Sequence, residues 1–169
     1  LAPEELSFHQ QSERELFLLA ARFKNVIPKS ELEAYAYKWQ WVENSYFESK
    51  RLSANYFSHI LEGYSHDEIS LKLKNISGYI ASVHQKKKNF FEEYRLPNSI
   101  QVLARELAHS IWWQDHRKGL AWWSCDAIDT LSRAAEREFG VSFDDLMLYT
   151  ADEWIALFEK RKKVSAKIL

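Results

Sequence analysis

The stretch from Ile100 to Phe139 contains no proline and a single glycine, Gly119. Proline breaks a helix and glycine weakens one, so a stretch of this length nearly free of both favours continuous helix over turns. Pro97 precedes the stretch and Gly140 follows it, and such residues are typical of the positions next to helix ends. The sequence therefore predicts one long helix here, either continuous or kinked near Gly119.

The rest of the chain shows the same helical spacing of apolar residues. We expect shorter helices over about residues 7–26, 30–42, 53–63, 65–76, 78–94, 143–148 and 151–162. A serine or threonine followed three residues later by glutamate is typical of a capping box, and this pattern occurs at Ser30 with Glu33, Ser65 with Glu68, and Thr150 with Glu153. Strand-like alternation is nearly absent. The predicted fold class is all-α: a multi-helix bundle with the long helix near its C-terminal half.

Length and composition suit one domain. The chain has 169 residues, of which 46% are hydrophobic and 28% charged, and such a chain buries a core of its own. We expect a single helical domain over residues 1–169, with short helices in 1–96 and the long helix and C-terminal helices in 97–169. The first residue is Leu1 rather than Met, so we also expect the chain to belong to a longer polypeptide.

Charge and residue usage exclude several kinds of partner and cofactor. The net charge is -1, so neither nucleic acid nor an anionic membrane is an expected partner. No apolar run approaches the roughly 20 residues of a membrane span. The four glycines lie far apart, so no phosphate-binding loop can form and no cofactor is expected in this chain. The single cysteine, Cys125, cannot form an internal disulfide, which predicts a reducing, cytoplasmic location.

A polar segment interrupts the apolar stripe of the long helix. The stripe comprises Ile100, Leu103, Leu107 and Ile111, and we expect it to face the core. The following turns carry polar residues instead: Gln114, Asp115, Arg117 and Lys118. Burying an unpaired charge is costly, so two interpretations stay open. The segment is a solvated kink or carries an Asp115–Lys118 pair, or it contacts a ligand or another domain.

Two tryptophan pairs, Trp112-Trp113 and Trp122-Trp123, flank this segment. Adjacent side chains on a helix point about 100° apart, so one face cannot bury all four. At least one of each pair should therefore meet a second layer of helices or a partner, and the alternative is an aromatic core in a thick bundle. The candidate contact residues are Gln114, Asp115, Arg117, Lys118, Trp112 and Trp123.

Neither a catalytic nor a metal-binding residue is predicted. Glu106 and His109 match the Glu-x-x-His pattern of di-iron bundles, but such a site needs a second copy of the pattern, and the chain has none. We expect no catalysis from this chain alone.

Three motifs in order resemble a known family. The segment Phe139–Glu153 reads FGVSFDDLMLYTADE, the segment Asp115–Lys118 reads DHRK, and the tyrosines and tryptophans of Glu33–Glu43 are followed by Leu52-Ser53 and Phe57. They are similar to the DL-x-YLT-x-E, D-x-RK and Y-x-W…LT-x-x-x-F patterns of phosphoenolpyruvate-utilising enzymes of the pyruvate-water dikinase (phosphoenolpyruvate synthase) kind.

The resemblance implies a helical region between a nucleotide-binding part and a swivelling phosphohistidine domain. The parent enzyme would use ATP and Mg, whereas the T/S-H-x-A setting of the phosphorylated histidine is missing around all six histidines here. Asp115, Arg117 and Lys118 would then contact other domains of the same polypeptide. Two alternatives stay open: an autonomous helical domain that binds another protein, and a small helical enzyme or ligand-binding bundle with the Trp-lined patch as its pocket.

Overall fold

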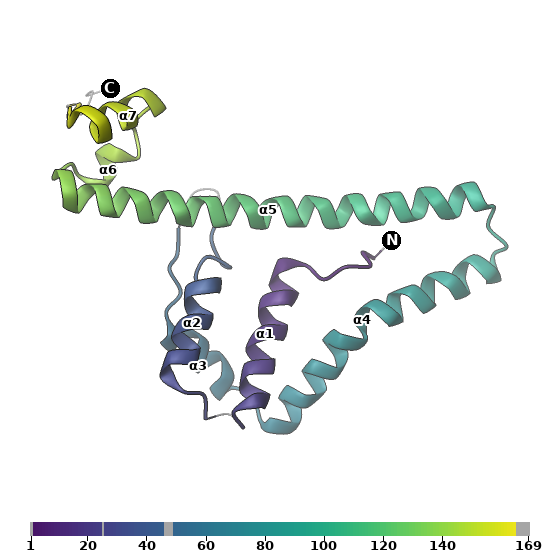
Figure 1. The fold of residues 1–169 in the computed structure, drawn as a ribbon. Helices are drawn as coiled ribbons and strands as arrows, with labels where there is room; N and C mark the ends of the chain where they lie inside the picture. The colour runs from purple at the N-terminus through teal and green to yellow at the C-terminus, as the bar shows by residue number, and fades with distance from the viewer. Residues whose placement is uncertain (1, 25, 46–48, 165–169) are drawn as a thin grey trace. The chain divides into compact units, whose positions relative to one another are not determined.

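The computed structural model of the protein describes residues 2–24, 26–45 and 49–164. These residues form helices and no strand, so the all-α prediction is confirmed (Figure 1). The helices are α1 (Phe8–Arg22), α2 (Lys29–Trp39), α3 (Ala54–Glu62), α4 (His66–Glu93), α5 (Asn98–Phe139), α6 (Phe143–Leu146) and α7 (Ala151–Lys160). The predicted long helix is α5, which has 42 residues and continues without a break through Gly119. None of the described helices combines the length and the hydropathy that a membrane-spanning segment needs.

The chain forms two compact units, residues 1–123 and residues 124–169. Their boundary falls inside α5, between Trp123 and Ser124, and not at Pro97. The expectation that the whole chain behaves as one domain stays a prediction.

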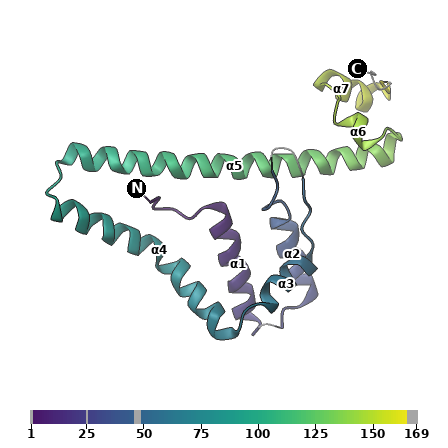
Figure 2. The ribbon, with the colours of Figure 1, turned by 180° about the vertical axis from the view of Figure 1, so that it is seen from behind.

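Unit 1 is built around α1, which packs against both α4 and α3 (Figure 2). Between α1 and α4 the buried side chains are Phe17, Ala20, Ile69 and Ile76. A second cluster joins α1 to α2 and α3 through aromatic and aliphatic side chains, and its buried members are Phe8, Leu16, Leu32, Tyr35, Ala36, Trp39, Val42 and Phe57. Burying a side chain of this size stabilises the fold by about 1.5–3 kcal/mol before entropy is counted.

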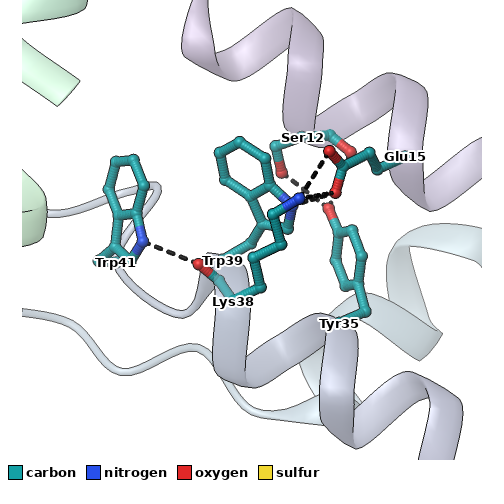
Figure 3. A network of polar contacts seen from close by, with 6 residues as sticks. All are labelled: Ser12, Glu15, Tyr35, Lys38, Trp39 and Trp41. Atoms are coloured by element: carbon teal, nitrogen blue, oxygen red, sulfur yellow. Dashed lines mark hydrogen bonds and ion pairs between the residues drawn. The ribbon is translucent and has the colours of Figure 1, made fainter.

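Hydrogen bonds between α1 and α2 fix the orientation of the two helices (Figure 3). The Tyr35 hydroxyl donates to the Ser12 carbonyl at 2.9 Å and lies 2.7 Å from the Ser12 hydroxyl. Burial raises the pKa of Tyr35 well above its usual value of 10. On the exposed side, Lys38 Nζ lies 2.8 and 2.7 Å from the two carboxylate oxygens of Glu15. Because these side chains connect the two helices at several points, α1 and α2 form a rigid platform.

Two of the three predicted capping boxes are present. Ser65 with Glu68 caps α4, and Thr150 with Glu153 caps α7. The Ser30–Glu33 box was a wrong prediction: α2 begins at Lys29, and Pro28 occupies the cap position. The Pro28 carbonyl accepts from the amides of Glu31 and Leu32 at 3.0 and 3.1 Å. Proline has a backbone angle suited to helix starts, so the cap position lies at Pro28, two residues before the predicted cap at Ser30.

We predicted that two helices would be separated next to Gly78, and this prediction was wrong, because Gly78 lies inside α4. A glycine within a helix costs only about 1 kcal/mol, so a helix capped at Ser65 continues past it. Gly140 does end α5, because its φ of +60° is a conformation that other residues rarely adopt.

Unit 2 has a small core of its own. The C-terminal part of α5 contributes Ala135 and Phe139, and the buried residues that pack with them are Val141, Leu146 and Leu157. The Phe139 and Phe158 rings meet edge to face with centroids 5.2 Å apart. The Tyr149 hydroxyl donates to the Val164 carbonyl at 2.8 Å, which holds the residues after α7 against this core.

Gly119 allows a close approach between α5 and Phe8 of α1. A Cβ atom at this position would lie 2.9 Å from Phe8 Cδ1 and 3.0 Å from Phe8 Cγ. Phe8 is itself buried, so its ring has little room to move away. Gly78 also lies within a helix, but a Cβ there would meet nothing within 4 Å.

We therefore expect opposite effects from the same substitution at these two glycines. Gly78→Ala should raise the free energy of unfolding by roughly 0.5–1 kcal/mol, because alanine favours the helix. Gly119→Ala should lower it by about 1 kcal/mol, because an overpacking cost of roughly 1–3 kcal/mol exceeds that gain. Urea unfolding followed by circular dichroism measures both values. Stabilisation by Gly119→Ala equal to that of Gly78→Ala would contradict the close contact with Phe8.

Candidate functional site

The middle of α5 packs on the rest of unit 1 through residues that follow one another at steps of four and three. We call them the inner face of α5: Ala108, Trp112, Asp115, Gly119 and Trp122. Trp112 Nε1 donates to the Leu6 carbonyl at 3.3 Å. Asn44 Nδ2 donates to the Trp122 carbonyl at the same distance. The inner face thus contacts both the segment before α1 and the segment after α2.

The apolar stripe of α5 does not face the core, and our prediction that it would was wrong. We call it the outer face: Ile100, Leu103, Leu107 and Ile111. Their side chains are 46%, 63%, 45% and 42% exposed. The reason is steric, because the small residues Ala108 and Gly119 let the other side of the helix approach unit 1 more closely than leucine or isoleucine would.

The polar segment is divided between buried and exposed positions. Gln114, Arg117 and Lys118 are exposed, whereas Asp115 is half-buried. No ion pair joins Asp115 to Lys118 in the part of the chain that the structure describes. The helix continues past Gly119, so the segment is not a kink. The predicted kink and the predicted Asp115–Lys118 pair are therefore both wrong, although three of the four residues are solvent-exposed, and the contact interpretation stays a prediction.

Asp115 and Trp122 bring buried polar atoms to the inner face. Asp115 Oδ2 and Trp122 Nε1 are both buried, and neither has a hydrogen-bond partner among the described residues. The His9 ring lies 5.8 Å from the Trp122 ring, edge to face. Burial lowers the pKa of His9 below its ordinary value of 6.5, while the negative charges of Asp115 and Glu43 act in the opposite direction. Asp115 therefore stabilises positive charge on His9 across this face.

Each tryptophan pair has one half-buried and one exposed member, which confirms that a single face could not bury all four. Trp112 and Trp122 belong to the inner face, whereas Trp113 and Trp123 are 51% and 56% exposed. The Trp112 ring is stacked on His116, with centroids 5.0 Å apart and an interplanar angle of 14°. Of the predicted contact residues, Trp112 and Asp115 thus share the inner face, while Trp123 lies elsewhere on α5.

Trp123, a predicted contact residue, lines a cleft together with residues that we did not predict to lie near it. The cleft has a volume of about 300 Å³, and the residues that form its walls include Phe8, Trp39, Trp41, His116 and Trp123. The aromatic spacing of Trp39 and Trp41 was visible in the sequence. Nothing in that spacing indicated that a helix some 80 residues later would lie opposite them.

Histidines and acids do not gather into a metal site within residues 2–24, 26–45 and 49–164, where no group of three potential metal ligands occurs. Glu106 and His109 are both exposed, and His109 Nδ1 lies 3.7 Å from Glu5 Oε1. The Glu-x-x-His pattern is thus part of a surface contact with the segment before α1.

No protein-family model, curated protein or solved structure matches the chain. The resemblance to phosphoenolpyruvate-utilising enzymes therefore stays a hypothesis that depends on motif order. The exposed surfaces of α5 are the main structural basis for a functional proposal.

The electrostatic coupling across the inner face can be tested with Asp115→Asn. Removing this carboxylate should lower the pKa of His9 further, because one of the two charges that favour its protonated form is lost. An NMR titration of the His9 ring measures the change. Asp67→Asn, at an exposed position in the first turn of α4, is the control and should leave His9 unchanged.

The same coupling has a consequence for stability. Folded His9 binds its proton less tightly than the unfolded chain, so acidification below pH 6.5 should lower the free energy of unfolding. Asp115→Asn should make this loss steeper. An identical His9 titration in wild type and Asp115→Asn would contradict the coupling.

Proposed function

We propose that the chain is a non-catalytic helical module of a cytoplasmic, phosphoenolpyruvate-utilising phosphotransferase. It would position a nucleotide-binding domain and a swivelling phosphohistidine domain, which would bind ATP and Mg themselves. Phosphoryl transfer depends largely on positioning and electrostatics, so a rigid helical module can contribute without touching the reacting groups. The order of the three motifs supports this assignment, and one structural observation supports the positioning role.

That observation is the exposed outer face of α5. Four large aliphatic side chains at steps of three and four remain between 42% and 63% exposed. A stripe with this spacing is typical of a helix face that packs against another element. Covering each side chain fully is worth about 1.5–3 kcal/mol relative to full exposure, so a partner that covered all four would gain considerably.

The outer face continues into an apolar groove beside it. The groove lies between α4 and the start of α5, has a volume of about 510 Å³, and is lined by Val83, Phe90, Leu96, Ile100 and Ala104 among others. Phe90 and Ile100 are both about half exposed. The apolar surface of this region thus extends across two helices, as expected for contact with a domain rather than with a single side chain.

Charge indicates what kind of surface would cover it. Lys118 follows Ile111 by two helical turns and continues the outer face, and Arg117 lies beside it. Both are exposed, and neither forms an ion pair within the described part of the chain. The domain that covers this face should therefore present an apolar surface with carboxylates near Arg117 and Lys118.

The alternative proposal is an autonomous helical domain that binds a separate protein through the same face. The two proposals differ in whether the occupant belongs to the same polypeptide. An immunoblot of source-cell lysate, with an antibody raised against this chain, distinguishes them. We expect a band several times larger than 20 kDa. A band near 20 kDa would contradict the phosphotransferase module and favour the alternative.

The outer face itself is tested in the full-length polypeptide with Leu103→Ser/Leu107→Ser. We expect phosphoenolpyruvate-dependent turnover to fall roughly tenfold or more, because small displacements of reacting groups are costly. Val102→Ser is the matched control: its side chain is 45% exposed in the same turn, but on the other side of the helix. Unchanged turnover in the double variant, or an equal loss in the control, would argue against docking through the outer face.

A further inference from the structure

The aromatic cleft of unit 1 lies on the other side of α5 from the outer face. The residues that line it include Phe8, Trp39 and Trp41 and, on α5, His116, Gly119 and Trp123. The residues come from three segments that are distant in sequence: the start of α1, the end of α2 and the middle of α5. A volume of about 300 Å³ is at the small end of the range for ligand pockets.

The wall formed by Trp39 and Trp41 is held in place by hydrogen bonds (Figure 3). Trp39 Nε1 donates to Glu15 Oε2, and Trp41 Nε1 donates to the Lys38 carbonyl, both at 2.8 Å. The Trp41 ring stacks on Phe8 with centroids 5.8 Å apart and is tilted by 33° against Trp39 at 5.6 Å. Because both indole N–H groups are bonded internally, the two rings have a fixed orientation and need little reordering to bind a ligand. Trp39 is only 6% exposed and Trp41 is half-buried, so Trp41 supplies most of the accessible ring surface of this wall.

The part of the cleft that α5 contributes is exposed. Trp123 is 56% exposed, and its ring makes no aromatic contact with Trp39 or Trp41 among the described residues. The cleft therefore offers a flat group both an exposed indole from α5 and the fixed indoles at the end of α2. Aromatic clefts of this kind bind either cations or planar rings.

The charges around the cleft discriminate between these two ligands. No aspartate or glutamate is among the described residues that line it, whereas Lys38 is. Glu15 accepts two bonds from the Lys38 ammonium group, which has three hydrogens, so one donor is left for a ligand. His116 makes ring contacts with Trp112 and Trp113, and its ring nitrogens form no hydrogen bond within the described residues. Glu15 already balances the Lys38 charge, but no carboxylate lines the cleft to pair with a bound cation, whereas an anion would find two hydrogen-bond donors.

We propose that this cleft binds a small planar aromatic anion. The ring lies between Trp123 and the Trp39–Trp41 wall, and the anionic group accepts hydrogen bonds from Lys38 and His116. This site does not depend on the proposed function, because the outer face is on the other side of the helix and shares no residue with the cleft.

The first experiment compares two probes of similar shape and opposite charge, 2-naphthoate and 2-naphthylmethylammonium. The seven tryptophans give seven indole N–H signals in a ¹H–¹⁵N spectrum of this chain, which single substitutions assign. We expect 2-naphthoate to shift the signals of Trp39, Trp41 and Trp123, with a dissociation constant of about 1 mM, as is usual for a ligand of this size. The Trp154 signal, from unit 2, should not move.

The cation should bind at least roughly tenfold more weakly, since no carboxylate lines the cleft to pair with its charge. Equal binding of the two probes would overturn the proposed ligand class. Absence of shifts at Trp39, Trp41 and Trp123 up to about ten times the expected dissociation constant would overturn the site itself.

Matched variants test the two contacts. Trp123→Ala should weaken 2-naphthoate binding about tenfold, because stacking on an aromatic side chain is lost. Tyr94→Ala removes a similarly exposed aromatic side chain of unit 1 outside the cleft, and should leave binding unchanged. Lys38→Gln should reduce the preference for the anion, with Lys118→Gln as its control. Thermal unfolding of each variant checks that unit 1 remains folded. Equal affinity in Trp123→Ala and Tyr94→Ala would overturn the proposal.

Discussion

The Phe8 ring lies directly against the backbone of Gly119, and the packing of α5 on the rest of unit 1 depends on this contact. Phe8 also stacks on Trp41 and meets Trp122 edge to face, at centroid distances of 5.8 and 5.3 Å. One buried ring therefore joins the start of α1, the segment after α2 and the middle of α5. A side chain at position 119 would push these three segments apart, since its first carbon would already be 2.9 Å from the ring. The same contact forms the floor of the aromatic cleft, so the shape of the cleft follows from the packing of the core.

The close approach at Gly119 also explains why the outer face of α5 is exposed. A helix that contacts its neighbours through alanine, glycine and edge-on tryptophan turns its large aliphatic side chains away from them. Leu103 and Leu107 are thus left uncovered, because the side of the helix that carries the small residues is the side that packs on the rest of unit 1. The inner face in turn accepts polar atoms that a leucine-lined interface would exclude, among them Asp115 Oδ2 near His9. Because the inner face of α5 is the buried side, the outer face is left as an exposed apolar surface, and Asp115 of the inner face lies within electrostatic range of His9.

Local sequence was a good guide wherever a few neighbouring residues decide the backbone. Ser65 and Thr150 cap helices as expected, Pro97 precedes α5, and Gly140 ends it with a positive φ. The two local errors have physical reasons as well. Pro28 begins α2 before Ser30 can cap it, and Gly78 is tolerated inside α4 because nothing there competes with the helix. The periodicity of apolar residues gave a wrong orientation for α5. The spacing of a hydrophobic stripe indicates that this face of the helix can be buried, but it does not indicate whether the chain's own core or another partner covers it.

The sequence alone determined that the chain is helical, where most of its helices begin and end, and that one helix is far longer than the others. It also determined that the paired tryptophans could not share one face, because adjacent side chains on a helix diverge by about 100°. Only the tertiary structure decided which side of α5 is buried, that Trp39 and Trp41 lie across a cleft from Trp123, and that Asp115 acts on His9. These outcomes depend on contacts between residues up to about a hundred positions apart. Such contacts follow from how side-chain volumes fit together in space, and no local pattern of residues encodes that fit.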